Sequence, residues 1–257
     1  MIKFLLALLF VVPTLAANRV IDLTTTNHIL IRGEISTSSM DQAAEQFANL
    51  VLKRTNGETI YVVLDSPGGD IQAGNDFIEF AKLVGNVETV SMFSASMAAG
   101  IVQGLPGKRL VTENGTVVFH RASGGFQGQF EDGEVENRLS YAKSLVRSME
   151  VRNSERMSLS LKGYKSKIRN ELWLYGRDAV TQKAADEVID LRCSKELVEG
   201  KTVSYMSIMG MFTIKVESSK CPLLKGIKAI KPTDEEQSAL VKYTQTYTSN
   251  GILRIGL

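Results

Sequence analysis

The sequence predicts an α/β fold, because short β-branched and aliphatic runs alternate with segments of helical periodicity through the first two-thirds of the chain. The clearest strand is Thr59–Leu64, a nearly continuous apolar run of the kind buried on both faces of a parallel sheet. The clearest helix is Ser38–Lys53, whose apolar residues recur at helical spacing behind Ser and Thr residues suited to cap its start.

The other elements continue this alternation. We expect them at 29–31 and 87–92 (strands), at 66–70 (a Gly-rich turn) and at 71–83, 96–102 and 131–161 (helices). Two short apolar segments, 110–111 and 116–120, flank Asn114-Gly115, the strongest short signal for a β-hairpin.

Composition narrows the function classes. The chain has 257 residues, of which 44% are hydrophobic, and a formal net charge of +2. That charge is too small to suggest a nucleic-acid surface. Asp65 and Asp70 flank the Gly-rich turn, but no His or further carboxylate joins them in a metal-ligand pattern, so capping or solvated roles are expected. The sequence therefore predicts a globular protein that needs no metal or organic cofactor.

The N-terminus predicts export. Lys3 precedes the apolar run Phe4–Val12, and Pro13 and small residues follow, which is the pattern of a secretory signal peptide over residues 1–16. The alternative is an uncleaved anchor, although the run is short of the roughly 20 residues that span a bilayer. We expect a periplasmic or extracellular protein.

Two cysteines lie late in the chain. Cys193 and Cys221 are the two cysteines of the sequence, and an even number of cysteines in an oxidising compartment predicts a disulfide between them. Beyond about Asp190 the sequence becomes polar and Lys-rich with little periodicity. We therefore expect one domain over 17–190 and a C-terminal extension over 191–257 that contains the disulfide.

A serine and a histidine are the candidate catalytic residues. The chain has two histidines, and His28 is expected on the surface ahead of the first strand. His120 ends an apolar strand and opens a Ser/Gly loop, a common place for functional groups in α/β proteins. Ser96 lies between a strand and a helix, where it is either an ordinary N-cap or a nucleophile beside the amides of the helix start.

Three segments together resemble the ClpP peptidases. Residues 65–74 (DSPGGDIQAG) resemble their Gly-rich loop, 95–97 (ASM) their nucleophile motif, and 120–129 (HRASGGFQGQ) the segment that begins with their catalytic histidine. The order and spacing agree, and the resemblance covers roughly residues 19–190. It implies the ClpP/crotonase-like ββα spiral and a Ser-His-acid triad with Ser96 as nucleophile and His120 as base.

The resemblance also assigns binding roles. It implies an oxyanion hole made by the N–H groups of Gly69 and Met97. Gly124, Gly125 and Phe126 would belong to the edge strand beside which the family lays an extended peptide. Family members assemble into rings, and the predicted helix at 131–161 is long enough to form the contact between subunits.

The third member of the triad departs from the family pattern. The family has an Asp two residues before an aromatic residue, whereas counting back from Trp173 gives Glu171. A glutamate can still orient the imidazole and stabilise its cation. Asn170 is the alternative, and either residue could instead be ordinary helix surface. We favour Glu171.

Three functions follow as hypotheses. The first is an exported serine peptidase that cleaves short or unfolded peptides, or a membrane-associated substrate, as a homo-oligomer. Being exported, it would act without the cytoplasmic ATP-driven unfoldase of ClpP. The second is an inactive scaffold with the same fold. The third is a crotonase-type acyl-thioester enzyme, against which the Ser96–His120 pair and the export signal argue.

Overall fold

A computed structural model describes residues 18–54, 57–124, 129, 131–208, 212–224 and 227–229. The expected signal peptide at 1–16 lies outside these residues. In the part of the chain that is described, no helix combines the length and apolarity that crossing a bilayer requires.

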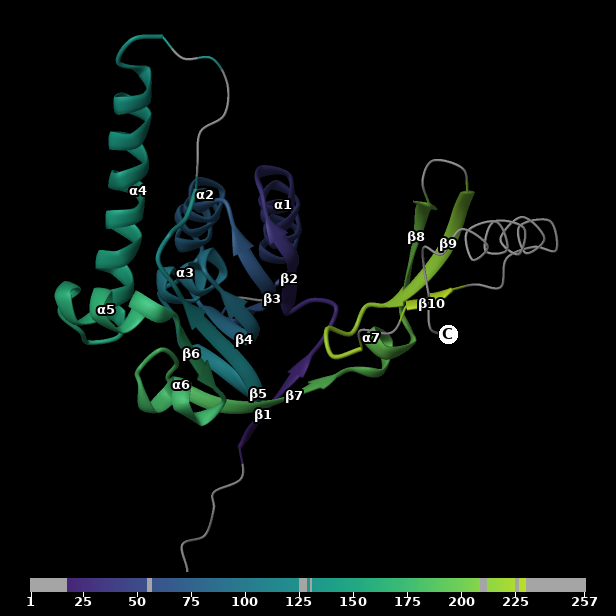
Figure 1. The fold of residues 1–257 in the computed structure, drawn as a ribbon. Coiled ribbons are helices and arrows are strands. Elements are labelled where there is room, and N and C mark those ends of the chain that lie inside the picture. The colour runs from purple at the N-terminus through teal and green to yellow at the C-terminus, as the bar shows by residue number, and fades with distance from the viewer. Residues whose placement is uncertain are drawn as a thin grey trace, which may run out of the picture.

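The centre of the molecule is a mostly parallel sheet of seven strands (Figure 1). The strands are β1 (Arg19–Leu23), β2 (His28–Ile35), β3 (Ile60–Gly69), β4 (Val87–Ala95), β5 (Arg109–Phe119), β6 (Leu172–Tyr175) and β7 (Glu187–Cys193). Their order is β1-β7-β5-β4-β3-β2, all parallel, and β6 pairs with β5 in the antiparallel sense. The expected α/β fold is confirmed.

Helices cover the sheet unequally. They are α1 (Thr37–Lys53), α2 (Ile71–Lys82), α3 (Met97–Gly104), α4 (Glu134–Arg156), α5 (Leu161–Lys167), the 3-10 turn η1 (Ile168–Asn170), α6 (Arg177–Thr181) and α7 (Lys195–Glu199). The largest apolar cluster joins α1, α2 and α3 to β2 and β3. A second cluster joins β5 and β6 to α5 and α6. Helix α4 rises clear of the sheet over most of its length (Figure 1).

The first two helices begin where their side chains can cap them. Ser36 accepts a hydrogen bond from the Ser39 N–H, and the Ser39 hydroxyl accepts one from the Ser36 N–H, which is a capping box at the start of α1. Asp70 accepts a hydrogen bond from the Ala73 N–H at 2.9 Å and caps α2. The expected helices at 38–53 and 71–83 are therefore confirmed to within two residues.

Two predicted turns are in fact strand. Leu110–Val111 and Thr116–Val118 both pair with β4 in the parallel sense, so they run in one direction and cannot be the arms of a hairpin. Residues 112–115 between them form a bulge within β5, where the register against β4 shifts. The Gly-rich segment likewise belongs to β3 as far as Gly69, which pairs with Ile35 of β2. In both places sheet pairing overrides a local turn signal.

The C-terminal region is joined closely to the sheet. Strand β7 continues through residue 190 to Cys193, so the expected domain boundary falls inside a strand. The disulfide Cys193–Cys221 is present, with a Cα–Cα distance of 5.8 Å. Cys221 is buried on the face of the sheet opposite α1–α3, together with Leu23 and Leu197. This contact covers apolar surface that the sheet would otherwise expose.

Beyond α7 the chain forms a second, smaller sheet. It consists of β8 (Lys201–Ile208), β9 (Phe212–Ser219) and β10 (Ile227–Ala229), all antiparallel in the order β10-β9-β8. Figure 1 shows the β8–β9 hairpin on the opposite side of the molecule from α4. The Arg32 side chain links this region to the main sheet by donating to the Pro222 carbonyl oxygen at 2.6 Å.

Candidate active site

Ser96 occupies a sharp turn between β4 and α3. Its backbone has φ 55° and ψ −120°, a conformation that costs a non-glycine residue free energy and is concentrated at functional sites. The Ser96 N–H donates to the Val118 carbonyl oxygen at 3.0 Å, which ties the turn to β5. The Ser96 side chain makes no capping hydrogen bond to α3. The hydroxyl is therefore presented at a strained strand-to-helix elbow, as in nucleophile elbows, and is not used as an N-cap.

Helix α3 supplies amides beside this hydroxyl. Met97 is its first residue, and the first amides of a helix have no partner inside the helix. All residues of α3 are buried. The positive end of the helix dipole therefore meets Ser96 in surroundings that screen it weakly.

The Gly-rich end of β3 lies directly against the elbow. A Cβ atom on Gly68 would stand 2.6 Å from the Ser96 Cβ and 2.9 Å from the Met97 nitrogen, so only glycine fits there. The Gly68 N–H donates to the buried Ser66 hydroxyl at 3.1 Å, which fixes the loop. At Gly69 the added atom would lie 2.1 Å from the Ile35 carbonyl oxygen. Backbone contact thus brings Gly68, Ser96 and Met97 together, and Gly69, the next residue, is held against Ile35.

His120 follows the neighbouring strand at the same edge of the sheet. Ala95, the last residue of β4, pairs with Val118, so Ser96 and His120 leave parallel neighbouring strands at nearly the same level. The half-buried His120 ring makes a 2.6 Å hydrogen bond from Nδ1 to the Arg121 carbonyl oxygen. Since a carbonyl only accepts, Nδ1 carries the proton and Nε2 has the free lone pair. No hydrogen bond between the Ser96 hydroxyl and this ring occurs among the described residues.

Glu171 directly precedes β6. The antiparallel pairing of β5 with β6 ends at Phe119 opposite Leu172, so His120 and Glu171 are the residues that adjoin the last pair of this ladder. Glu171 has φ 64°, and its Oε2 accepts a hydrogen bond from the Trp173 indole N–H at 2.8 Å. The carboxylate is thus paired with Trp173 and not with His120. Asn170 ends the turn η1 and is exposed.

Trp173 is a further residue of this site, and the sequence did not predict its role. Its ring contacts Phe93 on β4, with centroids 6.5 Å apart. The signal for its position was the alternation Leu172-Trp173-Leu174-Tyr175, which places the two aromatic rings on one face of a short strand.

His28 lies apart from this edge. It is the first residue of β2, a strand that β1 precedes, so the expectation that it comes before the first strand is wrong. The ring is half-buried, and its Nδ1 hydrogen-bonds the Thr24 carbonyl at 2.7 Å. Burial lowers the pKa of His28, and the Thr24 contact only partly offsets this effect.

The two acidic residues that flank the glycines have structural partners. Asp65 forms an ion pair with Arg32 at 3.0 Å, and Asp70 caps α2 as described above. Across the described residues, no three His, Cys, Asp or Glu side chains gather as metal ligands would.

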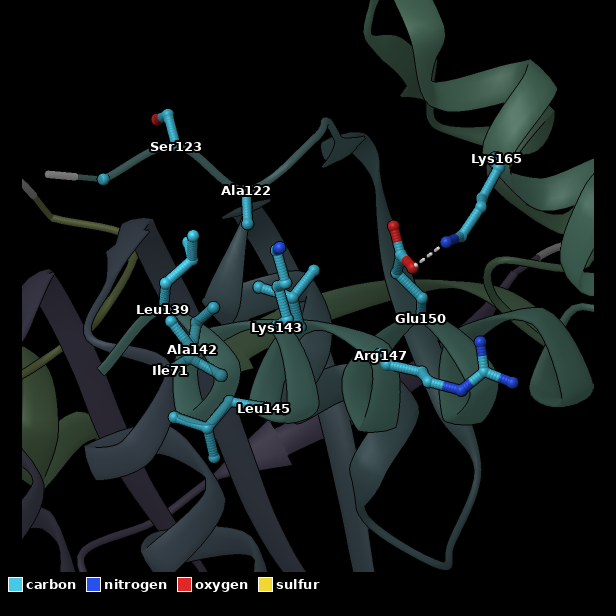
Figure 2. A pocket seen from close by; sticks show the side chains of 12 residues that line it. Ile71, Ala122, Ser123, Leu139, Ala142, Lys143, Leu145, Arg147, Glu150 and Lys165 are labelled. Atoms are coloured by element: carbon cyan, nitrogen blue, oxygen red, sulfur yellow. Dashed lines mark ion pairs between the residues drawn. The ribbon is translucent and has the colours of Figure 1, made fainter. Parts of the chain in front are cut away.

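A cavity of about 600 Å³ opens beside the candidate site (Figure 2). Its walls come from Ile71 at the start of α2, from Ala122–Gly124 just after His120, and from α4 and α5. Of the predicted substrate-binding residues, Gly124 lines this cavity, whereas Gly125 and Phe126 lie outside the described residues.

A comparison with protein families accounts for most of the chain. A family model described as Clp protease matches residues 15–192, which include the Ser96 elbow, the glycine segment, His120 and Glu171. The match ends at β7, just before the disulfide region and the small antiparallel sheet.

Proposed function

The chain belongs to the Clp protease family, and on that premise we propose that it is a serine peptidase in which Ser96 attacks the peptide carbonyl. The observation that carries this proposal is the strained Ser96 elbow against Gly68 at the start of a buried helix. The strained backbone of Ser96 costs free energy, and its hydroxyl does not cap the helix. Such strain is typical of a nucleophile elbow, where it presents the hydroxyl to the substrate.

The oxyanion would form against two backbone amides. Met97 contributes the first N–H of α3, backed by the helix dipole. Gly68 already donates to Ser66, and at the end of the ladder it is the Asp70 N–H that donates to Ile35. We therefore assign the second donor to the Gly69 N–H, the amide between these two. These contacts support Gly69 and Met97 as the pair.

His120 would act as the general base and then as the acid. Its Nδ1 proton is held by a carbonyl oxygen, which orients the neutral tautomer with Nε2 ready to accept the Ser96 proton. The proton then passes from Nε2 to the leaving amine, and a water molecule hydrolyses the acyl-enzyme by the same route. A rotation of the half-buried His120 side chain away from the Arg121 carbonyl oxygen completes the contact with Ser96 when substrate binds.

Glu171 would stabilise the imidazolium, with Trp173 holding it in place. A carboxylate has two oxygens, and the indole N–H occupies Oε2 alone. Oε1 is then left to accept the Nδ1–H of His120, once rotation of that ring has released it from the Arg121 carbonyl oxygen. A glutamate has one more rotatable bond than the aspartate of the family pattern, so an anchoring donor offsets its greater freedom.

The substrate would be an extended peptide in the cavity beside the Ala122–Gly124 segment. Family members commonly act on peptides as oligomers, and α4 has exposed apolar side chains that do not line this cavity, Val135 and Tyr141. We propose self-association through this helix. The Cys193–Cys221 disulfide supports an exported location, since such bonds persist in oxidising compartments.

An inactive scaffold is the second candidate. Two observations favour it: no Ser96–His120 hydrogen bond occurs among the described residues, and Glu171 faces Trp173. The test is hydrolysis of a mixture of short fluorogenic peptides by the mature protein. We expect turnover that Ser96→Ala and His120→Ala each reduce by at least about 1,000-fold while circular dichroism stays unchanged. Wild-type protein that is folded and oligomeric but cleaves nothing would establish the scaffold.

A further inference from the structure

The cavity beside the candidate site combines apolar walls with a cationic side. Ile71 comes three residues after Gly68, and Ala122 comes two residues after His120. The cavity therefore opens where a bound peptide would leave Ser96. Its apolar lining consists of Ile71, Leu139, Ala142, Leu145 and Val146. Such walls exclude water and concentrate the field of any charge beside them.

Three cations and one anion line the cavity. Lys143 and Arg147 lie one turn apart on α4, Lys165 comes from α5, and Glu150 is the anion. Glu150 is buried, and its Oε2 pairs with Lys165 Nζ at 2.8 Å, so the two charges offset each other. Figure 2 shows this pair at one end of the cavity.

Lys143 and Arg147 supply the remaining charge. Neither forms an ion pair in the part of the chain that the structure describes. Figure 2 shows the Lys143 ammonium directed from α4 toward the Ala122 loop, the side along which a peptide would lie. The chain as a whole carries a formal net charge of only +2, so this excess is a local property of the cavity.

We propose that this cavity selects peptides in which an acidic side chain lies within a few residues of the scissile bond and next to an apolar one. The apolar side chain of the peptide contacts the walls that include Ile71 and Leu145, and its carboxylate lies against Lys143 and Arg147. The proposal rests on the proposed peptidase function and adds its substrate class. A single exposed ion pair contributes modestly, so two cations beside apolar walls imply a preference of about five- to tenfold.

The test uses matched fluorogenic peptides that place Glu, Gln or Lys in turn at each position flanking one apolar residue. The full mature protein should cleave the best Glu peptide about five- to tenfold faster, in kcat/KM, than its Gln counterpart, with the Lys peptide slowest. Raising the salt concentration from about 50 to about 500 mM should shrink this ratio, because solvent-accessible charges are screened.

Charge reversal gives the decisive variants. Lys143→Glu should lower the Glu:Gln ratio of kcat/KM to one or below, and Arg147→Glu should shift the ratio in the same direction. Lys53→Glu makes the same charge change at the last residue of α1, away from the cavity, and should leave the preference intact. A Glu:Gln ratio near one in wild type, or a ratio that Lys143→Glu does not alter, would overturn the proposal.

Two further measurements distinguish failure of the proposed peptidase function from failure of the proposed peptide preference. If no peptide is cleaved, anisotropy titrations of Ser96→Ala with labelled Glu and Gln peptides still measure the preference, so loss of the peptidase function leaves the cavity testable. If Lys143→Glu changes the oligomeric state in light scattering but leaves the peptide ratio intact, this side of α4 is a contact with a second copy. That result would also overturn the proposal.

Discussion

The two halves of the candidate site are built by different means. Ser96, Met97 and the glycines are fixed by backbone atoms in close contact, with the buried α3 behind them. His120 and Glu171 are more accessible. The His120 ring is hydrogen-bonded to the Arg121 carbonyl oxygen and the Glu171 carboxylate to the Trp173 indole, so the two side chains are not paired with each other. The nucleophile half is therefore preorganised, whereas the base half depends on side-chain rotations that substrate must stabilise.

Each half should therefore be sensitive to a different kind of substitution. A methyl group is enough to damage the nucleophile half, because packed backbone leaves no room to adjust. The base half should tolerate changes of size but respond to the loss of single hydrogen-bond donors.

Among substitutions that leave the Ser96 and His120 side chains in place, the largest effect is expected from Gly68→Ala. The added Cβ would meet the Ala95 carbonyl oxygen and the Ser96 Cβ, both at 2.6 Å, and would displace the nucleophile. We expect kcat/KM for peptide cleavage to fall at least about 100-fold. Gly163→Ala, in helix α5, is the control and should leave activity intact, because its Cβ would meet only the Ser160 hydroxyl at 3.2 Å. Full activity in Gly68→Ala would refute the preorganised nucleophile half.

A smaller effect is expected from Trp173→Phe, which keeps the ring against Phe93 but removes the N–H that Glu171 accepts. We expect kcat to fall about tenfold with KM unchanged, because Trp173 does not line the cavity. In a Glu171→Asp background the same change should have little effect, since the shorter carboxylate no longer reaches the indole. An equal loss in both backgrounds would mean that Trp173 acts only through packing.

His28 is expected to make the stability of the fold depend on pH. Burial lowers its pKa in the folded protein, so the unfolded chain binds the proton more readily. The free energy of unfolding should therefore decrease as the pH falls through about 6.5, the ordinary value for histidine. Urea midpoints at pH 8 and pH 5 measure this change. His28→Asn should reduce the difference without affecting peptide cleavage at pH 8, and an unchanged pH dependence would contradict the assignment.

The smallest effect concerns strain that serves no chemistry. Lys183 has φ 59°, and its side chain is exposed. Lys183→Gly should therefore raise the free energy of unfolding by a few tenths to about 1 kcal/mol. Ser96→Gly should also relieve strain, yet it should abolish cleavage. If thermal denaturation shows Lys183→Gly to be neutral or destabilising, the cost assigned to positive φ at these two residues is too large.

Much of the fold could be predicted because its signals are local. The apolar run at 59–64, the capped helix at 38–53 and the two cysteines each carry their information within a few residues, and each is confirmed. The hairpin at Asn114-Gly115 failed because both flanking segments pair with β4, a partner distant in sequence. Turn propensity cannot report such pairing.

The site shows the same limit. The resemblance to the ClpP peptidases identified Ser96 and His120, and strand order explains why they share an edge. The positive φ of Ser96, the close approach of Gly68 and the pairing of Glu171 with Trp173 depend on tertiary contacts. Neither spacing nor composition contains that information.

Ser96 is proposed to be a nucleophile that His120 activates. The most direct measurement is labelling of the mature protein with a fluorophosphonate, followed by mass spectrometry of its peptides. We predict a single adduct on Ser96, absent in Ser96→Ala and formed at least about 100-fold more slowly in His120→Ala. Folded protein that remains unlabelled, or an adduct that forms at the same rate without His120, would contradict the account.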